Sequence, residues 1–168
     1  MKRFVLLAVL LFVYGCAYSF VGQNSSMMGG IKRLYIDNVV NLTTQPNLQI
    51  YLKGDLINTM NLDSRVSVVE SKDGADGILR VSILHYVIEP ISYDESGLSS
   101  RYRCTIDAKV SLISKNGEEL LNNREVSSYR DFNASGSVDA TEKARREVSK
   151  EVIKDLADKI KDLLFVGF

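Results

Sequence analysis

Two segments of the sequence have hydrophobic residues at the spacing of an amphipathic helix. In residues 47–61, apolar residues recur every four positions and form one stripe, made of Leu48, Leu52, Leu56 and Met60 with Ile57 beside it. From Asp139 onward a longer stripe continues almost to the end of the chain, through Ala140, Ala144, Val148, Val152, Leu156, Ile160 and Leu164. Asp139 and Glu142 have the spacing of a capping box. The sequence therefore predicts one helix near the start of the folded part and one at its end.

Other segments alternate between apolar and polar residues, as strands do, at residues 31–40, 65–70, 78–88, 102–112 and 119–131. The alternation is cleanest in residues 102–112, where one face carries only Tyr102, Cys104, Ile106, Ala108, Val110 and Leu112. In residues 78–88, strict alternation puts His85 on the same face as Leu79, Val81 and Ile83. Asn116-Gly117 is a strong hairpin signal. One face of these strands is expected to be buried and the other solvated.

These elements predict an α+β fold. Two amphipathic helices that pack on one face of a mostly antiparallel four-stranded sheet, with one short additional strand, would bury all of the apolar stripes. No internal repeat interrupts this order. We therefore expect residues 31–168 to form a single domain.

The N-terminal residues have the pattern of an export signal. Lys2 and Arg3 precede an apolar run of about eleven residues, which is too short to cross a bilayer as a helix, and the run ends at Gly15-Cys16. Val13-Tyr14-Gly15-Cys16 resembles a bacterial lipobox, in which the cysteine thiol takes a diacylglycerol and becomes the first mature residue. The alternative is an ordinary secretory signal cut near Gly15. We expect residues 1–15 to be a lipoprotein signal peptide.

Residues 16–30 are small, polar and glycine-rich, which is typical of a tether, here a lipidated one that begins at Cys16. Without residues 1–15, the chain has 19 basic and 21 acidic residues, a net charge of −2. This balance gives no reason to expect nucleic-acid binding. Cys104 then has no cysteine partner, and its place on the apolar face of a strand predicts a small buried hydrophobe.

The sequence does not contain the residues that the common catalytic or metal sites need. His85 is the only histidine, and the pattern favours a core or edge position over a catalytic one. One histidine and one available cysteine cannot supply the usual zinc ligands, and no phosphate-binding glycine motif or GxSxG elbow is present. We therefore expect no enzyme activity, no cofactor and no metal.

Two surface features are candidates for binding. Arg101, Arg103 and Lys109 project from the polar face of one predicted strand, and Lys115 lies in the adjoining hairpin. Such a face can pair with phosphates through charge-assisted hydrogen bonds, although an ordinary solvated strand face, balanced by Asp107, explains the same pattern. The second feature is the polar loop after the long strand, which carries apolar and aromatic residues suited to docking a partner: Pro90, Ile91, Tyr93 and Leu98.

Several short motifs, in this order, together resemble the LPS-assembly lipoprotein LptE family. They are Gly15-Cys16-Ala17-Tyr18-Ser19-Phe20, the strand at residues 31–39, Ala75-Asp76-Gly77-Ile78-Leu79, Arg101-Tyr102, Tyr129-Arg130-Asp131-Phe132, and Asp139 with the terminal helix. The resemblance covers essentially the whole mature chain. Ala17 stands where the family commonly has glycine.

The resemblance implies a lipid-anchored outer-membrane protein that faces the periplasm. Members sit inside the β-barrel of LptD, assist its assembly, and bind lipopolysaccharide as it is inserted into the outer leaflet. The resemblance assigns lipopolysaccharide binding to Arg101, Arg103, Lys109 and Lys115. The alternative is another envelope lipoprotein that acts as a scaffold or pilotin for a secretion pore.

Overall fold

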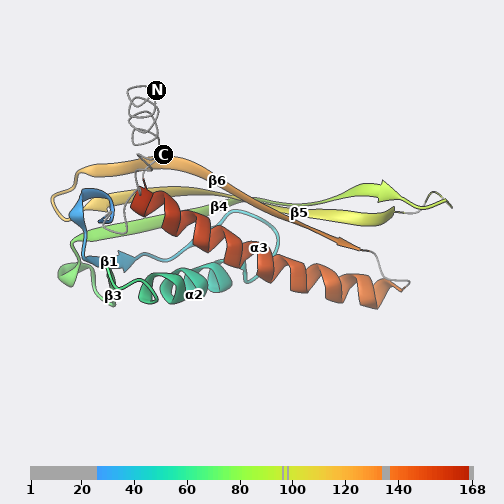
Figure 1. The fold of residues 1–168 in the computed structure, drawn as a ribbon, viewed down its shortest axis with the longest axis horizontal. Coiled ribbons are helices and arrows are strands. Elements are labelled where there is room, and N and C mark those ends of the chain that lie inside the picture. Colours follow the sequence, from blue (N-terminus) through green and yellow to red (C-terminus); the bar gives the residue numbers. More distant parts are fainter. Residues whose placement is uncertain (1–25, 96, 98, 134–136, 167–168) are drawn as a thin grey trace, which may run out of the picture.

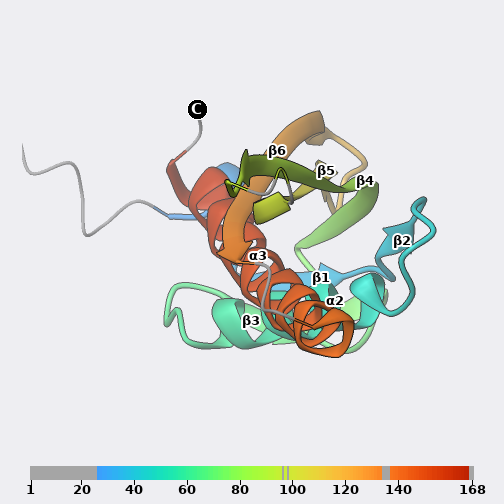
Figure 2. The same ribbon diagram turned by 90° about the vertical axis from the view of Figure 1, so that its right-hand side faces the viewer.

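The computed structural model describes residues 26–95, 97, 99–133 and 137–166, which form a mixed sheet covered on one side by two helices (Figures 1 and 2). The predicted α+β class and both predicted helices are confirmed. The helices are α2 (Leu48–Asn61) and α3 (Val138–Val166), and the strands are β1 (Arg33–Ile36), β2 (Val40–Asn41), β3 (Ser67–Val69), β4 (Gly77–Tyr93), β5 (Ser99–Ser114) and β6 (Glu119–Asn133). Two short 3₁₀ turns, η1 (Met28–Gly30) and η2 (Lys72–Gly74), complete the described elements.

The sheet is larger and more mixed than the sequence predicted. Its six strands run in the order β3-β1-β4-β5-β6, and β2 pairs with β4 beyond the end of β1. β4, β5 and β6 are antiparallel, but β1 pairs in parallel with both β3 and β4, and β2 also pairs in parallel with β4. The expectation of a mostly antiparallel four-stranded sheet therefore holds only for the central hairpins.

The molecule has two regions that differ in how the sheet is covered. We call the first region the base: it comprises β1–β3, α2, the C-terminal half of α3, and the parts of β4, β5 and β6 beside them. We call the second region the arm: it comprises residues 84–93, 99–107 and 127–133 of the sheet and the N-terminal half of α3. In Figure 1 the arm extends to the right, beyond α2, and only α3 lies along it. β4 alone has 17 residues, which span about 56 Å at roughly 3.3 Å per residue.

The hydrophobic core lies between the sheet and the two helices. The predicted stripe of α2 is confirmed, because Leu48, Leu52, Leu56 and Met60 are all buried. The cleanly alternating strand, β5, likewise buries its apolar face, including Cys104, whose predicted burial is confirmed. Met27 is 1% exposed, so the packed part of the chain includes residues before residue 31.

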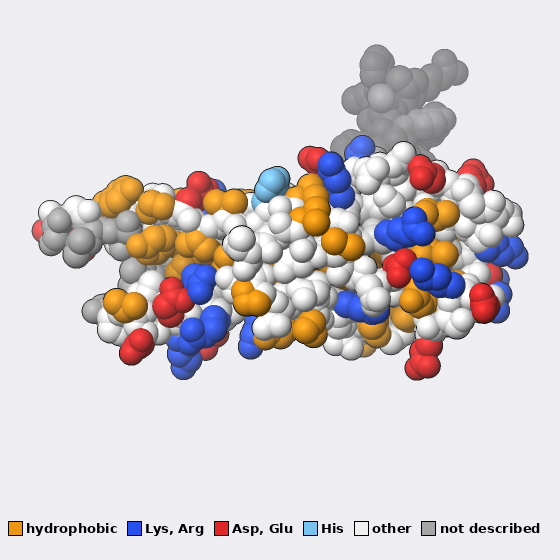
Figure 3. All heavy atoms as spheres, turned by 180° about the vertical axis from the view of Figure 1, so that it is seen from behind, with side chains coloured by type: hydrophobic (Ala, Val, Ile, Leu, Met, Phe, Trp, Pro, Cys, Tyr) orange, Lys and Arg blue, Asp and Glu red, His pale blue; other side chains and the backbone are white. Residues whose placement is uncertain are grey.

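A β-bulge in β4 changes which face its residues occupy. Ile83 pairs with Ala108 of β5 and His85 pairs with Asp107, so Leu84 is an extra residue. Beyond it, Tyr86 faces α3 and His85 faces solvent, where Figure 3 shows the only histidine of the chain on the surface. The prediction that His85 shares the face of Ile83 is therefore wrong, because alternation was extended through one unpaired residue.

The hairpin before β6 and the start of α3 are both close to their predicted positions. The hairpin at Asn116-Gly117 is confirmed: Gly117 has φ +85, and its N–H donates to the Ser114 carbonyl at 3.0 Å. At the other end, α3 is capped by Ser137 and not by the expected Asp139. The Ser137 Oγ accepts the Ala140 N–H at 3.3 Å, so the cap lies two residues before the Asp139 of the predicted capping box.

Candidate functional site

The exposed face of the arm brings together two of the four predicted basic residues. Arg103 of β5 donates to Asp131 of β6 through Nε (2.8 Å to Oδ1) and through a second guanidinium nitrogen (3.2 Å to Oδ2). Arg101 reaches the same carboxylate at 3.5 Å. The side chains of all three residues keep between 24% and 54% of their surface exposed. This group is accessible to a ligand, but it is already internally paired.

The shared carboxylate controls the charge of this group. Hydrogen bonding from Arg103 holds the pKa of Asp131 below its usual range, and Asp131 in turn raises the pKa of Arg103. Glu89 of β4 stands opposite Arg103 and also raises its pKa, so two carboxylates lie close to the two guanidinium groups. Arg103 also lies over the Tyr129 ring, 4.4 Å from its centroid, which is within cation–π distance.

The other two predicted basic residues lie elsewhere along the sheet. Lys109 is 3.7 Å from Glu125 on β6, so its charge is balanced locally. Lys115 is in the hairpin at the opposite end of β5 from Arg101, and fourteen residues of strand span about 46 Å. The sequence correctly placed Arg101, Arg103 and Lys109 on one face, but the structure does not bring the four together at one point.

The predicted docking loop is the tip of the arm. β4 continues to Tyr93, so Pro90, Ile91 and Tyr93 belong to its last residues, and Leu98 lies outside the described residues. Ile91 is 38% exposed and Tyr93 61% exposed. Val87 and Tyr129 are also exposed. They flank Thr105 on the solvent face of the sheet, the face that carries Arg103. Hydrophobic side chains lie along the arm in Figure 3, and charges of both signs lie on the arm as well as on the base.

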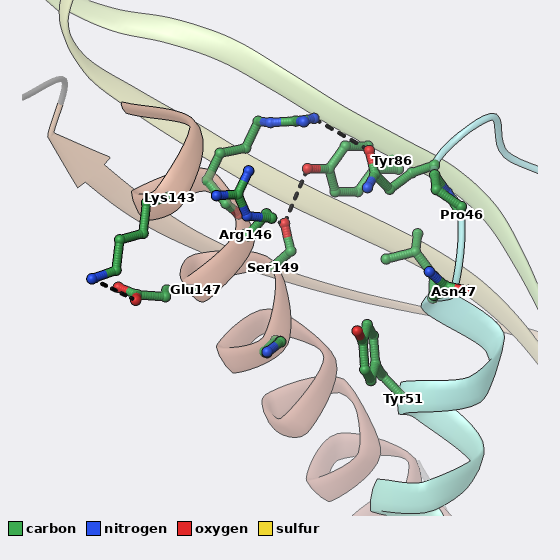
Figure 4. A pocket seen from close by; sticks show the side chains of 12 residues that line it. Pro46, Asn47, Tyr51, Tyr86, Lys143, Arg146, Glu147 and Ser149 are labelled. Carbon is green, nitrogen blue, oxygen red and sulfur yellow. Dashed lines mark hydrogen bonds and ion pairs between the residues drawn. The ribbon is translucent and has the colours of Figure 1, made fainter. Parts of the chain in front are cut away.

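A pocket of about 510 Å³ lies where the arm meets the base (Figure 4). It is formed by the segment before α2, the first turns of α2, the middle of β4 and the N-terminal half of α3. The residues that line it and that matter here are Gln45, Tyr51, Tyr86, Arg145, Arg146 and Lys150. The sequence pattern gives no sign of this pocket, because its two sides are about one hundred residues apart in the chain.

The floor of the pocket is held by hydrogen bonds. The Ser149 Oγ donates to the Arg145 carbonyl at 2.6 Å and accepts from the Tyr86 hydroxyl at 3.0 Å. Burial raises the pKa of Tyr86, so this hydroxyl stays protonated. The Arg145 guanidinium donates to Glu142 at 2.7 Å and to Gln45 at 3.2 Å, and this links α3 to the segment before α2.

The described residues include neither a metal-binding cluster nor a membrane-spanning helix. Among residues 26–133 and 137–166, as far as they are described, no three His, Cys, Asp or Glu side chains are grouped so that they could hold a metal ion. No helix in the described ranges combines the length and apolar character that a bilayer-spanning segment needs. His85 is exposed on the sheet face opposite α3, with no hydrogen-bonded nucleophile among the described contacts.

Comparison with protein families identifies the fold. The family model LptE, described as lipopolysaccharide-assembly, matches residues 31–164, which is most of the chain. The protein belongs to the LptE family. No curated protein matches the chain with significant sequence similarity.

Solved structures with the same fold include other LptE-like lipoproteins. Lipoprotein B from Nitrosomonas europaea has a TM-score of 0.59 at 20% identity, over 89% of this chain and 91% of that one. Rare lipoprotein B from Shewanella oneidensis has a TM-score of 0.53 at 15% identity, over 78% and 92%. PelC of Paraburkholderia phytofirmans, a dodecamer, has a TM-score of 0.52 at 14% identity, over 83% and 92%. At these identities the likeness extends to the fold alone.

Membership of the LptE family supports the sequence-based recognition and a role in lipopolysaccharide assembly. The family match does not depend on the N-terminal Gly15-Cys16 motif, because it begins at residue 31. Within the LptE fold of this chain, the arm carries exposed apolar side chains at Val87, Ile91 and Tyr93 together with Arg101 and Arg103, and the pocket lies at its root. Other exposed apolar side chains, such as Leu42 and Leu62, lie in the base. These are the two candidate sites.

Proposed function

We propose that this LptE-family protein is an outer-membrane lipoprotein that works by contact, as the lumenal partner of an LptD-type β-barrel during lipopolysaccharide insertion. A diacylglycerol on Cys16 would hold it at the periplasmic side of the membrane. It needs no cofactor and performs no catalysis in this role. The family match supports the connection to lipopolysaccharide, and the shape and surface of the arm support the barrel partnership.

The observation that carries the partner proposal is the exposed apolar tip of the arm. Ile91 and Tyr93 are exposed at the end of a long hairpin, far from the base. Exposed apolar side chains that gather in one place, with polar residues around them, are typical of protein interaction sites. Pro90 and Leu98 complete the proposed docking segment.

The solvent face of the sheet is suited to the lumen of a barrel. The interior of an outer-membrane barrel is polar. Arg101, Arg103, Thr105 and Asp107 of β5 point to this face, so it presents charges and hydroxyl groups.

The same face is proposed to contact lipopolysaccharide. Arg101 and Arg103 are paired with Asp131 at the surface, and an anionic group of the lipid could compete for these guanidinium groups. Lys109 and Lys115 would contribute separate contacts, because the structure spreads them along the strand.

Co-purification from native membranes tests the partner. We expect the intact chain to retain an LptD-type barrel, and Ile91→Asp with Tyr93→Asp to lose it. Leu62→Asp is the matched control, because Leu62 is 89% exposed but lies in the base. Equal recovery of the barrel with both variants would contradict the proposal, and recovery of a secretion pore in its place would favour the scaffold or pilotin alternative.

Surface capture tests the lipid. Arg101→Glu with Arg103→Glu is expected to weaken lipopolysaccharide binding more than it lowers the melting temperature, whereas Lys32→Glu in the base should do neither. Unchanged affinity would remove the arginines from the proposal. Mass spectrometry of the mature N-terminus tests the anchor, and a Cys16 without fatty acyl chains would contradict it.

A further inference from the structure

The pocket at the root of the arm has more positive charge than the chain neutralises. Arg146 and Lys150 both line it, and neither makes an ion pair with any Asp or Glu in the described ranges. All 21 acidic residues of the sequence fall within these ranges. In contrast, Arg101 and Arg103 share Asp131, and Lys109 has Glu125. The strongest unbalanced charge among the two candidate sites therefore lies in the pocket.

The positions of these cations follow from helix geometry. Residues 143, 146 and 150 are separated by three and four positions, so their side chains lie along one side of α3. Figure 4 shows Lys143 turned outward toward Glu147, while Arg146 lies beside Ser149. Arg146 and Lys150 are thus the two cations available to a ligand.

The opposite wall of the pocket is aromatic and amide-lined. Tyr51 rises from α2, and the Lys150 ammonium lies 5.6 Å from the centroid of its ring. Tyr51 is 42% exposed, so a ligand can reach the ring. An aromatic face with a polar hydroxyl edge packs well against the C–H face of a sugar ring.

The floor of the pocket does not need to rearrange. Arg145 is fixed by Glu142 and Gln45, and Ser149 is fixed by Tyr86 and the Arg145 carbonyl. A site that is already organised loses less entropy when a ligand binds. The volume of about 510 Å³ is within the range of ordinary ligand pockets.

We propose that this pocket binds a phosphorylated sugar, with the phosphate on Arg146 and Lys150 and the sugar ring against Tyr51. Guanidinium and ammonium groups without carboxylate partners favour a dianion, and the tyrosine supplies the flat surface that distinguishes a sugar phosphate from a bare anion. The sugar phosphate could be the headgroup of a glycolipid or a free metabolite. The assignment to lipopolysaccharide rests on the proposed function, whereas the assignment of the pocket does not.

Calorimetric titration with glucose 6-phosphate, inorganic phosphate and glucose tests the site itself. We expect the sugar phosphate to bind more tightly than either of the other two. Arg146→Ala with Lys150→Ala should weaken it at least about tenfold, since each substitution removes one charge-assisted hydrogen bond. Lys154→Ala, an exposed substitution one turn further along α3, is the matched control and should bind as the intact chain does.

Tyr51→Leu separates the two parts of the ligand. It should weaken glucose 6-phosphate binding and leave the affinity for inorganic phosphate unchanged. Equal affinity of the intact chain for phosphate and sugar phosphate would show an adventitious anion site and overturn the proposal. So would unchanged binding in the Arg146 and Lys150 double variant, or no binding of the sugar phosphate at all. Thermal melting checks that each variant is folded.

A second titration with lipopolysaccharide, before and after enzymatic removal of its phosphates, identifies the source. Loss of binding on dephosphorylation and in the double variant would assign the pocket to the lipid headgroup. If glucose 6-phosphate binds but lipopolysaccharide does not, the pocket stands as a site for a free sugar phosphate and the proposed function fails. If lipopolysaccharide binds equally to the double variant, the proposed function stands and the ligand of the pocket is again the free sugar phosphate.

Discussion

The base and the arm share three strands and one helix, but they differ in how much of the sheet is covered. In the base, α2 and α3 both pack on the sheet, and Leu52, Leu56, Leu156 and Ile160 are completely buried. In the arm only α3 is present: Cys104 and Ile106 are buried beneath it, whereas Tyr86, Ile88 and Phe132 are only partly buried against the core. The base therefore contributes most of the hydrophobic stabilisation, and the arm presents most of the exposed binding surface.

The largest expected difference between the two regions comes from removing side-chain volume. Leu156→Ala leaves a cavity between α3 and the sheet in the base and should lower the free energy of unfolding by about 2–5 kcal/mol. Val87→Ala in the arm, where the side chain is 43% exposed, should change it by no more than about 0.5 kcal/mol. Chemical denaturation measures both, and comparable losses would show that the arm is as tightly packed as the base.

A smaller effect is expected from the helix cap in the arm. Ser137→Ala removes the side-chain acceptor for the Ala140 N–H and should lower the free energy of unfolding by about 1 kcal/mol. Fraying should start in the N-terminal turns of α3. Cys104 is buried beneath α3 about three turns beyond this cap, with its Sγ 4.0 Å from the Ser149 Oγ. In a Cys16→Ser background, the rate of Cys104 modification by a thiol reagent should rise about fivefold if local opening exposes it.

The same experiment has a control in the base. Substituting Asn47, which precedes α2, removes no cap hydrogen bond, because its side chain makes none. Asn47→Gly should therefore leave the Cys104 modification rate unchanged. A rate that does not respond to Ser137→Ala would show that the arm opens only when the whole molecule unfolds.

The smallest effect is expected from acid. Asp63 has a pKa of about 2 because Arg65 hydrogen-bonds to it, and Asp76 has a pKa of about 2 because of Arg33; both pairs lie in the base. A carboxyl group with a lowered pKa stabilises the fold fully above its ordinary pKa, and this contribution is lost as the pH falls toward 2. The denaturant concentration at the unfolding midpoint should therefore decrease as the pH is lowered from 5 to 2.

The variant Asp63→Asn should lower the midpoint at pH 5 and reduce its further decrease at low pH. Asp131→Asn in the arm should act in the same direction but more weakly, since the pKa of Asp131 is lowered less strongly. Added salt should reduce both effects, because these pairs are near the surface. An acid response carried mainly by Asp131 would reverse the assignment to the base.

The sequence predicted the regular elements well because their hydrophobic periodicity is local. Both helices and the strands β4, β5 and β6 follow from spacing alone. The parallel pairing of β1 with β3 and β4 did not, because it joins segments more than thirty residues apart and depends on packing. The bulge at Leu84 was also missed, since one unpaired residue leaves no mark on a pattern of apolar residues.

The candidate sites show the same limit. The shared face of Arg101, Arg103 and Lys109 follows from the strand period, but their neutralisation by Asp131 and Glu125 depends on the register with β6. Arg146 and Lys150 read as a solvated helix face in the sequence. Only the fold places Gln45 and Tyr51 opposite them, and that turns two ordinary surface cations into part of a pocket.

The position of Met27 in the base has a consequence for reach. With a lipid on Cys16, the tether from the bilayer to the buried Met27 is eleven residues long, or at most about 39 Å when fully extended. This linker is shorter than β4, so an orientation with the tip of the arm at the membrane and the base at the far end is excluded for the anchored molecule. If the proposed anchor and barrel partner are both present, the base stays close to the leaflet that holds the acyl chains, and the arm is the part long enough to project into the barrel across a hydrocarbon layer of about 30 Å.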